Sequence, residues 1–395
     1  MKIGLLIPYL REPAGGEIQT LTLAIGLQSA GHDVIIYTHN ANSERCYPQL
    51  FSQVRVKSVT LPNSLQDKLQ ANKRTLMSLF AAFRPYYELL LMYQLSRIVD
   101  NDREVLLCTN MPSEWAAGLA SRRLRVPWVW ICNEPPFYFD SRIKKSLWRT
   151  IVPWPVYNLW DKWIVKSASQ IFSLSSTAKP YIDKVYGVNC RPEYLPFMPG
   201  SKFRPPHVPR KEGEPIRALF VASFSTYKRP QDAIEAMQYA PGATLNLIGQ
   251  GYMQKELEEQ IKRLNLQDRV HLIPRVDDKT LADYYANSDV FIHTAEQAWG
   301  LVAFDAMDRG LPVITCPACA IIEVMQDGKT GLFVPNRDPV AIAEKIRWVG
   351  EHGAEAEKIS KAGHAVVASL SMERYVRALE EAFTSALEKN AAKRK

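Results

Sequence analysis

The chain has 395 residues and a net charge of +8, with 47% hydrophobic and 23% charged residues. This composition is typical of a globular protein, and the length exceeds one ordinary hydrophobic core, so we expect two α/β domains of similar size. No run approaches the roughly 18 consecutive apolar residues of a membrane-spanning helix, and residues 1–9 lack a signal-peptide cleavage site, which predicts a cytoplasmic protein.

The first half of the chain alternates between strand and helix patterns. Residues 2–8 form an apolar run, residues 11–16 read as a glycine-bearing loop, and residues 17–30 show helical periodicity that ends at Gly31. Further apolar runs alternate with helical patterns, at residues 34–38, 105–109, 126–131 and 170–174. This alternation predicts a parallel sheet covered by helices.

Residues 142–166 carry an unusual mixture of cations and tryptophans. The cations are Arg142, Lys144, Lys145, Arg149, Lys162 and Lys166, and the tryptophans are Trp148, Trp154, Trp160 and Trp163. Tryptophan and lysine together are typical of a lipid headgroup interface, so we expect peripheral contact with an anionic membrane. The alternative is a solvated face over a tryptophan-rich core. Nucleic acid is not an expected partner, because no recognisable binding module accompanies the basic residues.

A second α/β series follows a proline-rich stretch. Seven prolines lie between residues 192 and 215, which predicts an interdomain linker. The strands that follow are expected at residues 216–222, 243–248, 270–273, 290–293 and 312–315. We place the domains at residues 1–208 and 209–368, with a C-terminal helix and basic tail at 369–395 that could pack back on the first domain. Ligands of such sheets lie beyond the carboxyl ends of the strands, so the chemistry is expected between the two domains.

Phosphate-binding candidates follow the strands of the second domain. Lys228 and Arg229 lie in a strand-to-helix loop, and Gly249 and Gly251 form a further turn with room for close backbone approach. Gly15 and Gly16 offer a matching loop in the first domain.

The helix expected at residues 301–309 offers another way to hold a phosphate. Gly300 precedes it, and the amides of Leu301, Val302 and Ala303 at its N-terminus would stabilise negative charge without a lysine. Asp305, one turn into the helix, could reach sugar hydroxyls.

These segments together resemble the retaining glycosyltransferases of family four, which have the GT-B fold of two Rossmann-like domains. The order and spacing of the motifs carry the resemblance over almost the whole chain: Gly15-Gly16 with GHDV, STYKRP with AIEA, LIGQG, RVHLIPRVDDKTLADYY, SDVFIHTAEQAWGLVAFDAM and DGKTGLFVPNRDP. The resemblance implies transfer of a sugar from a UDP- or GDP-linked donor, with retention at the anomeric carbon and without a metal or other cofactor.

The resemblance also implies roles for residues of the donor site. Lys228 would bind the diphosphate, Arg275 and Val276 would border the base, and Asp305 would take the place of the motif's second glutamate at the ribose. Residues 300–303 would supply amides.

The candidate catalytic residues are Asn133, Lys228, Gln297 and Glu296. The first glutamate of the motif falls on Gln297, and Glu296 beside it is the alternative. Asn133 occupies the position at which many members of the family have a histidine near the reacting sugar.

Some positions depart from the family pattern. Ser223 stands where an arginine usually partners the lysine, Asp305 is one methylene shorter than glutamate, and Cys319-Ala320 replace a glycine pair. We therefore keep two hypotheses. The first is a hexosyltransferase, with mannose slightly favoured, that acts on a lipid-linked or envelope glycan. The second is a catalytically weak GT-B protein that binds a glycan or a partner transferase.

Three further features are interpreted as structural. Cys316 and Cys319 form a single CxxC without a second pair, which favours a loop with buried thiols over a zinc site. Asp100-Asn101-Asp102 is formally a DxD motif, but its place before a strand favours an Asx-type turn. His293 ends a core strand, which favours a hydrogen-bonded structural histidine over a catalytic one.

Overall fold

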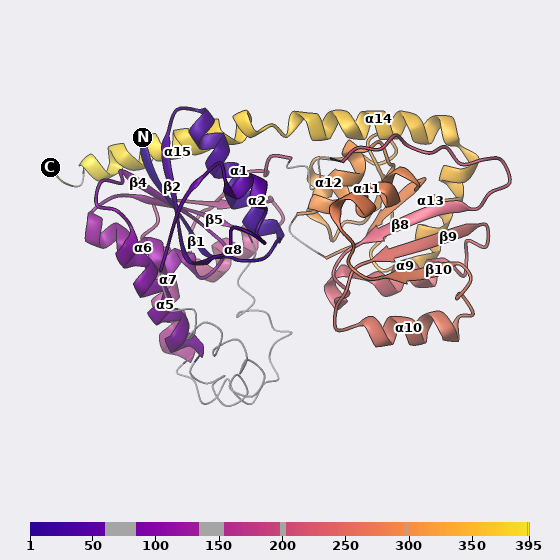
Figure 1. Cartoon of the computed structure of the whole chain (residues 1–395), viewed down its shortest axis with the longest axis horizontal. Helices are drawn as coiled ribbons and strands as arrows, with labels where there is room; N and C mark the ends of the chain where they lie inside the picture. Colours follow the sequence, from indigo (N-terminus) through magenta and orange to yellow (C-terminus); the bar gives the residue numbers. More distant parts are fainter. Residues whose placement is uncertain (60–83, 134–153, 198–202, 297–298, 393, 395) are drawn as a thin grey trace. The chain divides into compact units, whose positions relative to one another are not determined.

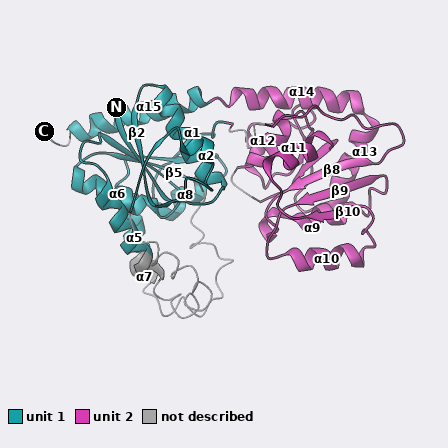
Figure 2. Ribbon diagram, viewed as in Figure 1, with its two compact units in different colours: residues 1–196, 372–395 teal, residues 197–371 magenta. Residues whose placement is uncertain are grey.

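The computed structural model describes residues 1–59, 84–133, 154–197, 203–296, 299–392 and 394. The chain divides into two compact units, which Figure 2 shows in different colours. Unit 1 comprises Met1–Pro196 and Met372–Lys395, and unit 2 comprises Phe197–Ser371. Each unit is described by itself.

The described part of unit 1 is built on a seven-stranded parallel sheet with the order β3-β2-β1-β4-β5-β6-β7. The strands are β1 (Lys2–Leu10), β2 (Asp33–Ala41), β3 (Arg55–Ser58), β4 (Val105–Thr109), β5 (Trp128–Cys132), β6 (Gln170–Ser173) and β7 (Arg191–Pro192). β1 lies at the point where the strand order reverses, with Ile3 beside Val34 of β2 and beside Val105 of β4. The predicted parallel sheet is confirmed.

Helices cover this sheet, as Figure 1 shows. They are α1 (Gly15–Ser29), α2 (Pro48–Phe51), α5 (Arg84–Ile98), α6 (Ser113–Leu124), α7 (Trp154–Val165), α8 (Lys179–Tyr186) and α15 (Met372–Ala392). The prediction that Gly15 and Gly16 belong to a loop is wrong, because α1 already begins at Gly15. Among the described residues, no helix is both long and apolar enough to span a membrane.

The last helix, α15, belongs to unit 1 although unit 2 precedes it in the chain. His32 Nε2 lies 2.8 Å from Glu380 Oε1, and Arg374 forms an ion pair with Glu193. A Cβ atom on Gly26 would lie 2.6 Å from Met372 Cγ, so α1 and α15 pack closely at this glycine. The C-terminal helix therefore completes the fold of the N-terminal unit.

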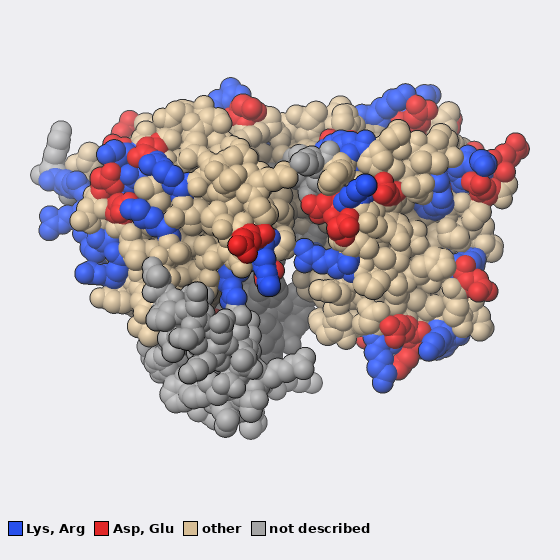
Figure 3. Space-filling view, in the orientation of Figure 1, with Lys and Arg blue, Asp and Glu red and all other residues tan. Residues whose placement is uncertain are grey.

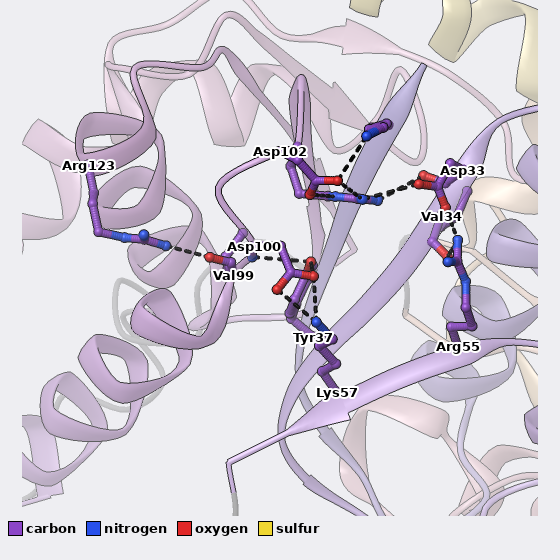
Figure 4. Close-up of polar contacts among 11 residues, drawn as sticks. Asp33, Val34, Tyr37, Arg55, Lys57, Val99, Asp100, Asp102 and Arg123 are labelled. Carbon is purple, nitrogen blue, oxygen red and sulfur yellow. Dashed lines mark hydrogen bonds and ion pairs between the residues drawn. The ribbon is translucent and has the colours of Figure 1, made fainter.

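The two aspartates of the DxD motif hold the amino-terminal edge of the sheet of unit 1 together (Figure 4). Asp100 accepts hydrogen bonds from Lys57 Nζ at 2.6 Å and from Tyr37 Oη at 2.9 Å. Asp102 forms an ion pair with Lys2 over 3.0 Å and another with the buried Arg103 over 2.9 Å. From the turn between α5 and β4, Asp102 thus contacts the start of β1, and Asp100 contacts side chains of β2 and β3.

The described part of unit 2 has a six-stranded parallel sheet with the order β10-β9-β8-β11-β12-β13. The strands are β8 (Ile216–Val221), β9 (Ala243–Ile248), β10 (Val270–Ile273), β11 (Val290–His293), β12 (Val313–Thr315) and β13 (Leu332–Phe333). The helices are α9 (Pro230–Ala236), α10 (Gln254–Arg263), α11 (Asp278–Ala286), α12 (Leu301–Asp308), α13 (Pro339–Glu351) and α14 (Gly353–Ser369). Phe220, Leu247 and Ile292 are among the buried side chains of its core.

The proline-rich stretch is divided differently from the predicted linker. Along the chain, the boundary between the units falls between Pro196 and Phe197 rather than between residues 208 and 209. A second boundary falls between Ser371 and Met372. Residues beyond 203 pack on unit 2, because Val208 N donates to Ala286 O at 2.8 Å and Arg217 Nη2 donates to Val208 O at 2.6 Å. These hydrogen bonds to the backbone of Val208 attach the second half of the stretch to unit 2.

Candidate functional site

Three loops meet at the carboxyl edge of the sheet of unit 2. The loop after β8 bonds to the loop after β9, with Phe224 N donating to Gln250 O at 3.0 Å. It also bonds to the loop after β11, with Glu296 N donating to Tyr227 O at 2.7 Å. The sequence-predicted donor residues of these loops therefore lie at one edge of one sheet, where parallel α/β sheets bind ligands.

Close packing of the protein's own backbone requires glycine at positions 249 and 251. A Cβ on Gly249 would lie 1.9 Å from Ala222 O, and one on Gly251 would lie 2.2 Å from Phe224 O. Carbonyl oxygens of the loop after β8 thus occupy the space that a side chain would need at these positions. Close contact between the two loops explains both glycines.

Lys228 ends a short 3-10 turn (Thr226–Lys228) in the loop after β8. Its ammonium lies 5.1 Å from the ring centroid of Tyr227. Burial lowers the pKa of His293, at the end of β11, to about 3, and the positive charge of Lys228 contributes to this shift. The lysine therefore lies near the end of β11, and His293 stays neutral at pH 7, as suits a structural histidine.

Arg229 is engaged within its own loop. Its Nε donates to Asp232 Oδ2 at 2.8 Å and its Nη2 donates to Asp232 Oδ1 at 2.5 Å, a bidentate pair with a buried carboxylate. Arg229 precedes α9 with a left-handed φ of 59°. The predicted role of Arg229 in binding the donor competes with this ion pair. Ser223 is exposed, and its hydroxyl lies 3.4 Å from that of Ser225.

The N-terminus of α12 follows Gly300, as the sequence predicts. The Ala303 amide donates to Gly300 O at 2.9 Å, and the Phe304 amide donates to the same oxygen at 3.2 Å. The Ala303 amide predicted for a phosphate thus already has an acceptor within the first turn of α12. Of the three amides predicted to bind a phosphate, those of Leu301 and Val302 remain as candidates.

Asp305 is half-buried on α12. Burial raises the pKa of Tyr285, and the nearby Asp305 carboxylate adds to that rise. Arg309, one turn further, lies with its guanidinium 5.0 Å from the Tyr285 ring centroid. The carboxylate predicted at the ribose thus lies beside a buried tyrosine of α11.

Glu296 forms an ion pair with Arg337, which precedes α13. Arg337 Nε and Nη2 donate to Glu296 Oε1 at 2.9 and 2.6 Å. Glu296 is mostly buried, whereas the Arg337 side chain is mostly exposed. Gln297, on which the first glutamate of the motif falls, lies outside the described residues.

The remaining predicted residues of unit 2 lie in the loops after β10 and β12. Arg275 is exposed and Val276 is half-buried, directly before Asp277, which caps α11 by accepting a hydrogen bond from Thr280 N at 2.8 Å. Cys316 and Cys319 are buried free thiols, and burial raises the pKa of Cys319 to about 12. Within the described residues, no group of three or more His, Cys, Asp or Glu side chains is arranged to hold a metal ion.

A second polar cluster lies at the carboxyl edge of the sheet of unit 1. Asn133 Nδ2 donates to Asn110 Oδ1 at 2.5 Å, and a Cβ on Gly16 would lie 2.0 Å from Asn110 Nδ2. Asn110 follows β4, Asn133 follows β5, and Gly16 lies in the first turn of α1. Gly16 and Asn133 are predicted site residues, whereas Asn110 is not, because its only signal is its position directly after a predicted strand.

Of residues 142–166, the structure describes 154–166, and all of these except Lys166 belong to α7. Leu159 and Trp163 are 67% and 52% exposed, and the Arg122 guanidinium lies 3.3 Å from the ring centroid of Trp163. Leu90 and Tyr93 of α5 are 52% and 51% exposed. We call Leu90, Tyr93, Leu159, Trp163 and Arg122 the α5–α7 surface, since α5 and α7 both contact α6.

Two family models match the chain in succession. "Glycosyltransferase Family 4" matches residues 13–196, and "Glycosyl transferases group 1" matches residues 204–366. The chain belongs to the family 4 glycosyltransferases. It is therefore an enzyme of the transferase class, as predicted.

Curated relatives agree with the assignment of the chain to this glycosyltransferase family. The chain is 32% identical over 139 residues to D-inositol 3-phosphate glycosyltransferase of Geodermatophilus obscurus, a match that covers 35% of this chain and 30% of the relative. It is 27% identical over 202 residues to D-rhamnosyltransferase WbpZ of Pseudomonas aeruginosa, covering 50% of this chain and 52% of the relative. The chain thus spans about half or less of the length of these relatives.

Solved structures show the fold of this glycosyltransferase over its whole length. HepE of Anabaena, in complex with UDP and glucose, is 17% identical to this chain. The two structures superpose with a TM-score of 0.73 over 98% of this chain and 100% of HepE. WaaG, a glycosyltransferase involved in lipopolysaccharide biosynthesis, is 16% identical. It superposes with a TM-score of 0.65 over 97% of this chain and 99% of WaaG. The predicted GT-B fold is confirmed.

Proposed function

We propose that the protein transfers a hexose, with mannose slightly favoured, from a UDP- or GDP-linked sugar to a lipid-linked or envelope glycan. The observation that carries the proposal is the meeting of the Lys228 loop, the Glu296 loop and the loop after β9 at one sheet edge. That HepE is known in complex with UDP-glucose supports a nucleotide-sugar donor.

The proposed transfer retains the configuration at the anomeric carbon and uses no metal or other cofactor. The bond from the anomeric carbon to the β-phosphate oxygen breaks, and the acceptor oxygen forms the new bond on the same face. The departing β-phosphate oxygen takes the acceptor proton. Lys228 stabilises the negative charge that grows on the diphosphate, and the amides of Leu301 and Val302 add to this effect.

The first test is nucleotide binding. A thermal-shift screen with UDP, GDP, their hexose conjugates and ADP as control is expected to show one selective stabilisation, which Lys228→Ala abolishes. The same variant is expected to lose sugar transfer. A protein that no nucleotide stabilises and that transfers no sugar would overturn the proposal.

The acceptor is proposed to reside in an anionic membrane, at its cytoplasmic face, that the α5–α7 surface contacts. Exposed apolar and aromatic side chains beside cations suit a headgroup layer. Figure 3 shows several Lys and Arg side chains, with Asp and Glu among them, at one end of unit 1. Co-sedimentation with vesicles rich in anionic lipid is expected to fall strongly in Leu159→Ser/Trp163→Ser. Tyr239→Ser, an exposed position of unit 2, serves as control. Equal binding by all variants would contradict the contact.

The alternative function is a catalytically weak protein that binds a glycan or a partner transferase. It is favoured by the bidentate pair of Arg229 with Asp232, because neither Arg229 nor the exposed Ser223 then supplies a second cation to a diphosphate. Measurable turnover that Lys228→Ala abolishes would exclude this alternative.

A further inference from the structure

Asn110 joins two segments of unit 1 that lie far apart in the sequence. Its amide oxygen accepts from Asn133 Nδ2 at 2.5 Å. Its amide group fills the space beside Gly16, where a Cβ would lie 2.0 Å from Nδ2 and 2.5 Å from Oδ1. The missing side chain of Gly16 therefore makes room for this amide.

The backbone around Asn110 is held firmly. Thr109 Oγ1 lies 2.8 Å from Thr20 Oγ1, and Ser113 Oγ donates to the carbonyl oxygens of Thr109 and Asn110 at 2.5 and 2.7 Å. Asn110 has a φ of 57°, in the left-handed region that glycine, asparagine and aspartate adopt most readily. These contacts hold the backbone from which the Asn110 side chain extends.

The hydrogen bond between the two amides fixes which atoms remain for a ligand. Because Asn133 donates to Asn110 through Nδ2, its own Oδ1 is an acceptor, and this buried atom has no hydrogen-bond partner among the described residues. A buried carbonyl oxygen without a partner costs free energy that a bound donor would recover. An oxygen acceptor attracts the hydroxyl of a neutral sugar and repels a phosphate oxygen.

We propose that Asn110 is a positioning residue that orients the Asn133 amide to accept a hydrogen bond from a sugar hydroxyl of the substrate. The inference rests on the proposed function and deepens it, since it assigns this edge of unit 1 to a sugar hydroxyl instead of a phosphate. Gly16 then serves to admit the Asn110 amide.

Two substitutions at Asn110 distinguish the effect of its side-chain amide from the effect of its left-handed backbone. Asn110→Gly removes the side chain and keeps the left-handed backbone, whereas Asn110→Asp retains an oxygen that accepts from Asn133. Asn265, with a φ of 54° in unit 2, provides the matched control Asn265→Gly. Thermal unfolding is expected to change little in the two glycine variants, which shows that both fold.

Steady-state turnover then tests the positioning role. Asn110→Gly is expected to lower kcat/KM about tenfold, Asn110→Asp to retain most of it, and Asn265→Gly to leave it unchanged. A change in the KM of the donor alone or of the acceptor alone identifies which substrate bears the hydroxyl. Asn110→Gly/Asn133→Ala is expected to be no worse than Asn133→Ala, because Asn110 acts through Asn133.

Three results would overturn the inference: full activity in Asn110→Gly, equal losses in Asn110→Asp and Asn110→Gly, or additive losses in the double variant. UDP or GDP binding by thermal shift separates this failure from failure of the proposed function. Wild-type protein that binds a nucleotide and transfers sugar upholds the function, whatever Asn110 does. If the wild type does neither, the function fails and the inference fails with it.

Discussion

Arg337 holds the carboxylate of Glu296 through two hydrogen bonds to a single oxygen, from Nε at 2.9 Å and from Nη2 at 2.6 Å. Arg337 does so from a left-handed backbone with a φ of 57°, a conformation that suits glycine and costs other residues about 1 kcal/mol or more. Backbone strain of this kind persists where the surrounding structure enforces it, often at functional sites. Glu296 is a candidate catalytic residue, so the strain coincides with the candidate site.

Replacing Arg337 is expected to separate stability from activity. Arg337→Gly relieves the backbone and loses an ion pair whose arginine is exposed, so the free energy of unfolding should change little. Turnover should fall, because Glu296 loses the group that orients it. Denaturant unfolding and steady-state kinetics measure the two effects.

Arg125 supplies the matched control for this experiment. It has a φ of 58° at the end of α6, so Arg125→Gly relieves the same backbone conformation in the other unit. This variant should keep its full activity. If Arg337→Gly also kept it, the ion pair would be a surface contact without a role in transfer.

Gly16→Ala should impair activity more than folding. The added Cβ would lie 2.6 Å or less from three atoms of the Asn110 amide, which would have to swing away and break its bond to Asn133. We expect a loss of about 1 kcal/mol in the free energy of unfolding and a kcat/KM close to that of Asn110→Gly. Gly353→Ala is the control, since no atom lies within 4 Å of its added Cβ. Normal turnover in Gly16→Ala would contradict the packing argument.

Gly251→Ala should destabilise unit 2 through the backbone. Its Cβ would lie 2.2 Å from Phe224 O and 2.8 Å from Phe224 N, so the loop carrying Lys228 would have to move. Overpacking of this kind typically costs about 1–3 kcal/mol. Gly242→Ala adds its Cβ to open space and should be close to neutral. Thermal unfolding of both variants measures the difference, and equal midpoints would refute it.

The stability of unit 1 should fall as pH rises from about 4 to about 6. Burial raises the pKa of Asp161 to about 6, although Trp115 Nε1 and Tyr186 Oη donate hydrogen bonds to its carboxylate at 2.8 and 3.0 Å. The folded state then binds more protons than the unfolded state, so the free energy of unfolding decreases as Asp161 ionises. Glu114, also buried, has its pKa raised by burial and by the Asp161 charge.

Asp161→Asn tests this pH dependence. It removes the buried charge and keeps polar partners for Trp115 and Tyr186. The variant should be more stable than the wild type at pH 7.5, by on the order of 1–3 kcal/mol, and similar to it near pH 4.5. Urea unfolding at the two pH values provides the comparison. A variant that is less stable at pH 7.5 would show that the ionised carboxylate stabilises the fold.

Strand and helix periodicity revealed the two parallel sheets, because apolar runs such as residues 105–109 become fully buried strands. The start of α1 was missed because glycine disfavours helices, and the contact of Gly16 with Asn110 that compensates for this joins distant segments. Asn110 itself escaped notice because one polar residue after a strand forms no pattern. The ion pair of Arg229 with Asp232 could be predicted from the sequence, because Asp232 follows Arg229 at the helical i, i+3 spacing.

The return of the chain to unit 1 after unit 2 has a consequence for folding during synthesis. Residues 197–371 form a complete unit by the time α15 is made, whereas unit 1 still lacks the helix that packs on α1. Tyr375, Leu379 and Phe383 of α15 are all buried in the finished fold. Until α15 is made, the surface of unit 1 on which these side chains pack stays exposed. The N-terminal unit should therefore be the last part of the protein to reach its native state on the ribosome, exposing apolar surface that a chaperone could bind.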